Sequence, residues 1–166
     1  MTRGPAFWIA CGFGSGLVPW APGTAGSLAA LAAGMALLAF DPALLLLAAA
    51  LGVFGGFWAV QASGAENDPG WVVIDEFAGQ WIAMAPLAFL PAAAVCNPPS
   101  LLLAFSAFRA LDILKPGPVG WADRQEGAAG IMADDVIAGL LAALIVYAAQ
   151  VLLPAWFATP PAALFN

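Results

Sequence analysis

The sequence predicts an all-α protein, an integral membrane bundle of about five hydrophobic helices with its polar loops on one side. Its composition is 63% hydrophobic and 8% charged, and its mean hydropathy is +0.94. A soluble domain is seldom so apolar, although a soluble core rich in Ala and Leu is the alternative. Four charge-free runs, residues 4–40, 42–65, 77–108 and 136–166, each hold a segment near the roughly 20 apolar residues that cross a bilayer. We expect residues 1–166 to form a single membrane-embedded domain.

The charged residues gather in two windows. Eight of the fourteen lie between Arg109 and Asp135, and four more are Glu66, Asp68, Asp75 and Glu76. Because a charge beside apolar runs must be hydrated, paired or bound to a cation, this clustering predicts a functional site. The net charge of −6 argues against a nucleic-acid partner, since phosphate backbones are bound by an excess of Lys and Arg.

The first two expected helices follow a Gly/Pro-rich loop. Residues 12–27, GFGSGLVPWAPGTAGS, form this loop, with Thr24 or Ser27 as the candidate N-cap of a helix over residues 28–40. The second helix runs from about Ala43 to Ala62. Small residues along it suit close approach by a neighbouring helix.

Three further helices are expected after the first charged window. They are Phe77 to about Leu90, Leu101 to Leu114, and Val136 to about Leu153, the last capped by Asp134 and Asp135. The fourth segment is only about 21 Å long as a helix. It therefore begins earlier, thins the bilayer or is buried within the bundle.

The sidedness follows from counting crossings. If the five helices cross in turn, the Gly/Pro-rich loop and both charged windows lie on the same side. All four basic residues lie there too: Arg3, Arg109, Lys115 and Arg124. By the positive-inside tendency this side is the cytoplasm.

Two pairs of adjacent carboxylates share one context, Asp75-Glu76 and Asp134-Asp135. Each pair stands at an expected helix start and is followed one turn later by a glycine, Gly79 or Gly139. Complementing the amide-rich end of a helix is one explanation for such a pair. The glycine, which removes bulk from the face of the carboxylate, favours a site that admits a partner or ligand.

The fourth helix adds charges of both signs. Arg109, Asp112 and Lys115 recur at i, i+3 and i+6, so neighbours can touch, and a structural ion-pair ladder is one interpretation. The functional interpretation is that Arg109 and Lys115 hold a phosphate while carboxylates hold a hard divalent cation. Oxygen ligands in a chain without His select Mg²⁺ or a similar ion. The candidate metal ligands are Asp75, Glu76, Asp112, Asp134 and Asp135.

The Gly/Pro-rich loop is a weaker signal, because Gly and Pro at a helix entrance often form no more than a turn. It lacks the Lys-Ser/Thr ending of a nucleotide-binding loop. Its backbone amides, with the hydroxyls of Thr24 and Ser27, are nevertheless suited to a phosphate oxygen.

Three blocks together resemble the bacterial phosphatidylglycerophosphatase A family: GFGSGLVPWAPGTAGSLAA, IDEFAGQWI and FRALDILKPGPVGWADR…GIMADDVIAG. The resemblance covers about half of the chain, and it is specific to the blocks jointly. It implies an inner-membrane, Mg²⁺-dependent enzyme that removes the terminal phosphate of phosphatidylglycerophosphate, a membrane lipid, to give phosphatidylglycerol. It also implies a helical bundle in which one helix is enclosed by the others.

The same resemblance assigns roles to single residues. The acidic core consists of the five candidate ligands, of which Asp75, Glu76, Asp112 and Asp135 are also the candidate catalytic carboxylates. Arg109, Lys115 and Asp123 complete the site on this interpretation, and Thr24 and Ser27 bind the substrate from the Gly/Pro-rich loop.

Other membrane phosphatase chemistries lack their residues in this chain. It has no His, no Cys loop followed by Arg, and no Asp-x-Asp motif. Two rival classes remain: a small ion-coupled transporter, whose charges would relay ions near the bilayer midplane, and a structural membrane protein. The oligomeric state is open.

Overall fold

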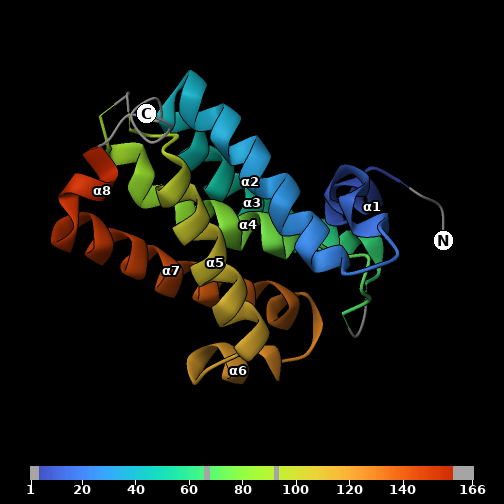
Figure 1. Ribbon diagram of the computed structural model, residues 1–166. Helices are drawn as coiled ribbons and strands as arrows, with labels where there is room; N and C mark the ends of the chain where they lie inside the picture. The colour runs from blue at the N-terminus through green and yellow to red at the C-terminus, as the bar shows by residue number, and fades with distance from the viewer. Residues whose placement is uncertain (1–3, 66–67, 92–93, 159–166) are drawn as a thin grey trace.

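Helices make up all the regular structure that is described for this chain. The computed structural model describes residues 4–65, 68–91 and 94–158, and within these ranges it contains no strand (Figure 1). The prediction of an all-α fold is therefore confirmed. The elements in chain order are α1 (Pro5–Ala10), η1 (Gly12–Leu17), α2 (Pro22–Phe40), α3 (Pro42–Ser63), α4 (Ile74–Met84), η2 (Ala85–Phe89), α5 (Pro98–Leu114), α6 (Pro118–Asp123), α7 (Gly127–Leu152) and α8 (Pro154–Ala158).

Three of these helices are long and apolar enough to cross a membrane. They are α2, α3 and α7, and with 22 and 26 residues α3 and α7 extend about 33 and 39 Å. Large apolar side chains on their outer faces are exposed, among them Phe54 at 77% and Leu144 at 64%. Such faces suit lipid rather than water, so the chain is a membrane protein. The expected count of about five spanning helices is not confirmed.

Helix α4 lies inside the bundle. Eight of its eleven residues are buried, and it packs against α2, α3, α5 and α7 (Figure 1). The expectation that one helix is enclosed by the others is therefore confirmed. Because Asp75 and Glu76 stand in its first turn, this enclosed helix brings two carboxylates into the interior.

Helix α2 begins earlier than expected. Its N-cap is Ala21, in the left-handed region at φ +49°, and Pro22 opens the first turn with a φ that is already helical. Thr24 and Ser27 therefore lie inside the helix, and the prediction that either caps it is wrong. Residues 12–17, expected as loop, form the short helix η1.

Helix α7 also begins earlier, at Gly127, with Glu126 as its N-cap. Asp134 and Asp135 thus lie about 10–12 Å inside the helix, and the prediction that they cap it is wrong. The preceding residues 128–133, AAGIMA, are mostly good helix formers, so nothing local delays the helix start.

The third and fourth helices also differ at their ends. α4 begins at Ile74 and ends at Met84, and the chain continues as η2, where Pro86 has no N–H to extend the α-helical ladder. α5 begins at Pro98, three residues before the expected start, which is one of the three alternatives for the short fourth segment. The short helices α1, α6 and α8 were not predicted.

Candidate active site

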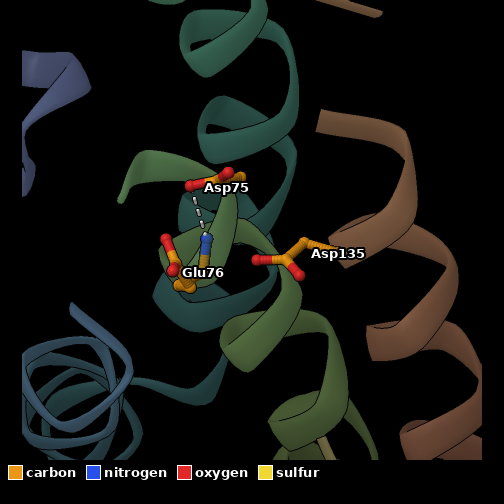
Figure 2. A group of neighbouring side chains, drawn as sticks. All are labelled: Asp75, Glu76 and Asp135. Atoms are coloured by element: carbon orange, nitrogen blue, oxygen red, sulfur yellow. Dashed lines mark hydrogen bonds between the residues drawn. The ribbon is translucent and has the colours of Figure 1, made fainter. Parts of the chain in front are cut away.

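Five carboxylates from three helices meet at one end of the bundle. One carboxylate oxygen each from Asp75, Glu76 and Asp135 lie within 4.8 Å of one another, and so do oxygens of Asp112, Asp134 and Asp135. Figure 2 shows Asp135 reaching from α7 toward the pair on α4. Because Asp135 belongs to both groups, the five side chains form one continuous acidic site. These are the five residues that the sequence predicted together.

Two glycines allow α4 and α7 to cross closely enough to form this site. A Cβ on Gly139 would lie 2.5 Å from the Gly79 carbonyl oxygen and 2.9 Å from its Cα. A Cβ on Gly79 would lie 2.6 Å from the Asp135 carbonyl oxygen and would also strike the Phe108 ring. The partner that each glycine admits is therefore the other helix, and the contact sets the distance between Asp75 and Asp135.

Asp75 also accepts a hydrogen bond from a free backbone N–H in the first turn of α4. Its Oδ1 accepts a hydrogen bond from the Glu76 backbone N–H at 3.1 Å, drawn as the dashed line in Figure 2. This N–H is one of the amides that an α-helix leaves without an internal partner. Capping and membership of the acidic site are thus combined in one residue.

Arg109 joins α5 to the first turn of α2. Its guanidinium forms an ion pair with Asp112, and Nη2 lies 3.4 Å from Thr24 Oγ1. A Cβ on Gly23 would strike Glu76 Oε1 and lie 3.6 Å from Arg109 Nη1. The start of α2 therefore closes one side of the acidic site, and Thr24 borders it as expected.

Ser27 lies one turn deeper than Gly23. Its side chain is fully buried, and its hydroxyl donates to the Gly23 carbonyl at 2.8 Å. Because the hydroxyl proton is used within α2, the geometry favours Thr24 over Ser27 as a substrate contact. A role for either residue in substrate binding stays a prediction.

The predicted ladder of Arg109, Asp112 and Lys115 on the fourth helix is only partly present, because Lys115 pairs elsewhere. Lys115 ends α5 in the left-handed region at φ +46°, so it leaves the helical face that carries Arg109 and Asp112. Its Nζ pairs with Asp123 and, at 2.9 Å, with Asp134. The Arg109–Asp112 step of the ladder is present, whereas the step from Asp112 to Lys115 is replaced by these two pairs.

The charge of Lys115 is held by these two carboxylates. Burial lowers the pKa of Lys115, but the hydrogen bonds to Asp123 and Asp134 outweigh it and hold that pKa above its ordinary value. Lys115 is therefore a permanent cation at neutral pH. Asp123, which only the family resemblance suggested, reaches the site through Lys115.

A polar cavity of about 280 Å³ adjoins the acidic site. Asp123 and Asp134 line it together with Asp68, from the segment before α4, and with residues 124–127, 130 and 131. The pKa of the Asp68 carboxyl is raised above its ordinary value. Desolvation is the largest cause, the nearby Lys115 opposes it, and the charges of Asp123 and Asp112 add to it. Asp68 is thus in electrostatic contact with the site. Sequence reasoning counted it in the first charged window but gave it no role, because only the fold brings that segment to α6 and α7.

The fold and the site define a class of protein: a helical membrane protein with an acidic site and flanking cations at one end of the bundle. The family model described as phosphatidylglycerophosphatase A matches residues 8–150. The chain belongs to the phosphatidylglycerophosphatase A family, which comprises phosphomonoester hydrolases that act on a lipid.

Individual relatives agree with this assignment. The phosphatidylglycerophosphatase A of Haemophilus influenzae is 39% identical, with 88% of this chain and 89% of the relative covered. The protein of that name from Escherichia coli is 38% identical over 86% and 82%. A Bacteroides thetaiotaomicron protein named after a phosphatidylinositol-3-phosphatase activity is 40% identical over 86% and 91%. No solved structure matches the chain.

Proposed function

We propose that this chain hydrolyses the terminal phosphomonoester of phosphatidylglycerophosphate in a Mg²⁺-dependent reaction, giving phosphatidylglycerol and phosphate. The observation that carries the proposal is two clusters of three carboxylate side chains, which share Asp135. Arg109 and Lys115 flank these clusters. Anionic ligands for a cation beside cations for an anion are what a metal-assisted reaction at a phosphate requires.

The donor set fits Mg²⁺. Ionised carboxylates are acceptors only, and hard oxygen ligands are those that Mg²⁺ prefers. Glu76 Oε2 is buried and has no hydrogen-bond partner among the described residues. This oxygen is therefore available as a metal ligand. Asp135 likewise has no ion pair within the described ranges. The residues that would hold the metal are Asp75, Glu76, Asp112, Asp134 and Asp135.

A bound divalent cation supplies positive charge against the phosphoryl oxygens and lowers the barrier to attack by water. Arg109, next to Thr24 at the start of α2, would hold a second oxygen of the phosphate. Lys115 holds Asp134 and Asp123 in place and adds a permanent positive charge. A carboxylate of the cluster orients the attacking water.

The cavity beside the site is suited to the rest of the headgroup. Its lining carries carboxylate and amide groups, which bind the hydroxyls of a glycerol unit. The acyl chains of the lipid stay in the bilayer, since the outer faces of α3 and α7 are apolar.

The place of the enzyme in the cell follows from the same arrangement. We propose the bacterial inner membrane, with several crossings and the acidic site toward the cytoplasm, the side that receives Arg109, Lys115 and Arg124. Topology reporters inserted after Ser63 and after Lys115 should behave as cytoplasmic, and one at Asn97 as external. Opposite behaviour of the first two reporters contradicts the arrangement.

Phosphate release in detergent tests the activity directly. We expect release from phosphatidylglycerophosphate, its loss in excess chelator, and its return with Mg²⁺. Undiminished turnover in chelator contradicts the metal role. Phosphatidylinositol-3-phosphate is the comparison substrate, because one relative is named after that activity. Faster turnover of this lipid changes the assigned headgroup but not the class of reaction.

An ion-coupled transporter is not favoured. The family is one of hydrolases, and the charged side chains gather at one end of the bundle beside α6 and the start of α2. A proton or ion relay requires ionisable groups that continue through the membrane.

A further inference from the structure

Gln80, on the enclosed helix α4, is a buried amide without a partner. It is fully buried, and neither Oε1 nor Nε2 forms a hydrogen bond with the residues that the structure describes. Glu76 Oε2 and Arg109 Nε are buried and unpartnered in the same way. Buried polar groups in folded proteins are almost always paired, so these atoms call for partners of complementary kind.

The register of α4 against α2 places Gln80 directly beneath Glu76. Gln80 follows Glu76 by one turn and precedes Met84 by one turn, so the three share a face. Glu76 meets Gly23 of α2, and Met84 lies 2.9 Å from a Cβ placed on Gly34 of α2. Gln80 therefore points toward the same side of α4 as the carboxylate of Glu76, one turn deeper in the bundle.

The unpartnered atoms are complementary in kind. Gln80 Nε2 is a donor and Glu76 Oε2 an acceptor, while Gln80 Oε1 is an acceptor and Arg109 Nε a donor. Side chains at i and i+4 of a helix are within reach of each other. The side chains of Arg109 and Glu76 lie close to each other, because both approach Gly23. One amide can thus satisfy both groups, directly or through a water.

We propose that Gln80 is a positioning residue of the active site that links Glu76 to Arg109 through its amide. The inference rests on the proposed function, in which Glu76 holds Mg²⁺ and Arg109 holds phosphate. A donor to Glu76 Oε2 fixes the orientation of that carboxylate, and an acceptor for Arg109 Nε fixes the guanidinium. Groups that orient metal ligands in this way change metal affinity or activity by about 10- to 100-fold when they are lost.

The test replaces Gln80 by Met, which keeps the length of the side chain but removes the amide. We expect Gln80→Met to need about 10-fold more Mg²⁺ for half-maximal phosphate release. We also expect Mg²⁺ to raise its melting temperature less than that of the wild type. Without Mg²⁺ the variant should melt no higher than the wild type, because Glu76 Oε2 and Arg109 Nε lose a buried hydrogen-bond partner.

Ser100→Ala is the matched control. Ser100 is also buried, and its Oγ also has no partner among the described residues, but it stands in the first turn of α5, more than two helical turns before Arg109. Its removal should leave the Mg²⁺ requirement and the Mg²⁺-induced thermal shift unchanged.

The outcomes separate this inference from the proposed function. A Gln80→Met protein with the Mg²⁺ requirement and thermal shift of the wild type overturns the inference, and so does one that no longer folds. If the wild type releases no phosphate from phosphatidylglycerophosphate, the proposed function fails. The thermal shift still tests Gln80 in that case, and a wild type without any Mg²⁺-induced shift contradicts both.

Discussion

The two pairs of adjacent carboxylates, on α4 and on α7, have the same context in the sequence but are held in different ways. Asp75 and Glu76 open a short enclosed helix, where Asp75 accepts a free backbone N–H. Asp134 and Asp135 lie inside the longest helix, where the backbone amides are already bonded. There Asp134 is balanced by Lys115, whereas Asp135 has no ion pair within the described ranges.

This difference teaches which carboxylate depends most on a ligand. A buried charge needs a backbone donor, an ion pair or a bound cation. Asp75 has the first and Asp134 the second, whereas Asp135 faces carboxylates on both sides. We infer that Asp135, which belongs to both carboxylate groups, and Glu76, which has neither an ion pair nor a backbone donor among the described residues, depend most on the proposed cation. Four predictions test this ranking.

Asp135→Asn should have the largest effect. It removes the one carboxylate common to both groups, and a loss of several kcal/mol of charge stabilisation lowers kcat by about 10³-fold. The same change relieves repulsion among buried acids, so the variant should melt at a higher temperature than the wild type without Mg²⁺. Steady-state kinetics and thermal unfolding in detergent measure the two effects. Near-normal kcat with intact Mg²⁺ dependence would remove Asp135 from the centre of the site.

Gly139→Ala breaks the crossing that brings the two pairs together. The new Cβ would lie 2.5 Å from the Gly79 carbonyl oxygen, and overpacking of this kind costs about 1–3 kcal/mol of stability. Activity should fall with it, because α4 and α7 move apart. Gly55→Ala is the control, since nothing lies within 4 Å of its Cβ position, and it should be neutral or stabilising by up to about 1 kcal/mol. Equal melting temperatures for the two variants contradict the close crossing.

Asp134→Asn should cost less than Asp135→Asn. Lys115 already offsets the charge of Asp134. Neutralising Asp134 therefore removes less of the negative charge that attracts the proposed metal ion. We expect kcat to fall by about 10-fold, which corresponds to about 1.4 kcal/mol. The comparison is made under saturating Mg²⁺ and substrate. An effect as large as that of Asp135→Asn would mean that the ion pair does not distinguish the two neighbours.

Lys115→Met should have the smallest effect and should appear mainly in KM. The substitution deletes the ammonium and keeps the apolar stem, and the attraction of a partly exposed charge, about 1 kcal/mol, corresponds to about a fivefold change. The Mg²⁺ requirement should stay the same or decrease, because a cation leaves the neighbourhood of Asp134. Lys115→Arg, which keeps the charge, should lie closer to the wild type. A well-folded Lys115→Met enzyme with unchanged KM and kcat would reduce Lys115 to a structural ion pair.

Much of the candidate site was readable from residue types and their spacing. Charges are rare in this chain, so each cluster stood out, and five of the gathered acids do meet in space. Partners of single groups were harder to predict. Lys115 ends its helix in a left-handed conformation. Only contacts with neighbouring elements bring Gln80 and Asp68 to the site. Such contacts join segments that are far apart in the chain, and no local pattern encodes them.

The sequence by itself determined the apolar helical composition, the location of the charged windows and the family. Hydropathy and residue identity are local properties, so they survive without knowledge of the fold. The tertiary structure alone decided that α4 is enclosed, that Lys115 pairs with Asp123 and Asp134, and that two glycines set the crossing. The physical reason is that packing decides which helices touch and which partner a buried group meets, and packing depends on several helices at once.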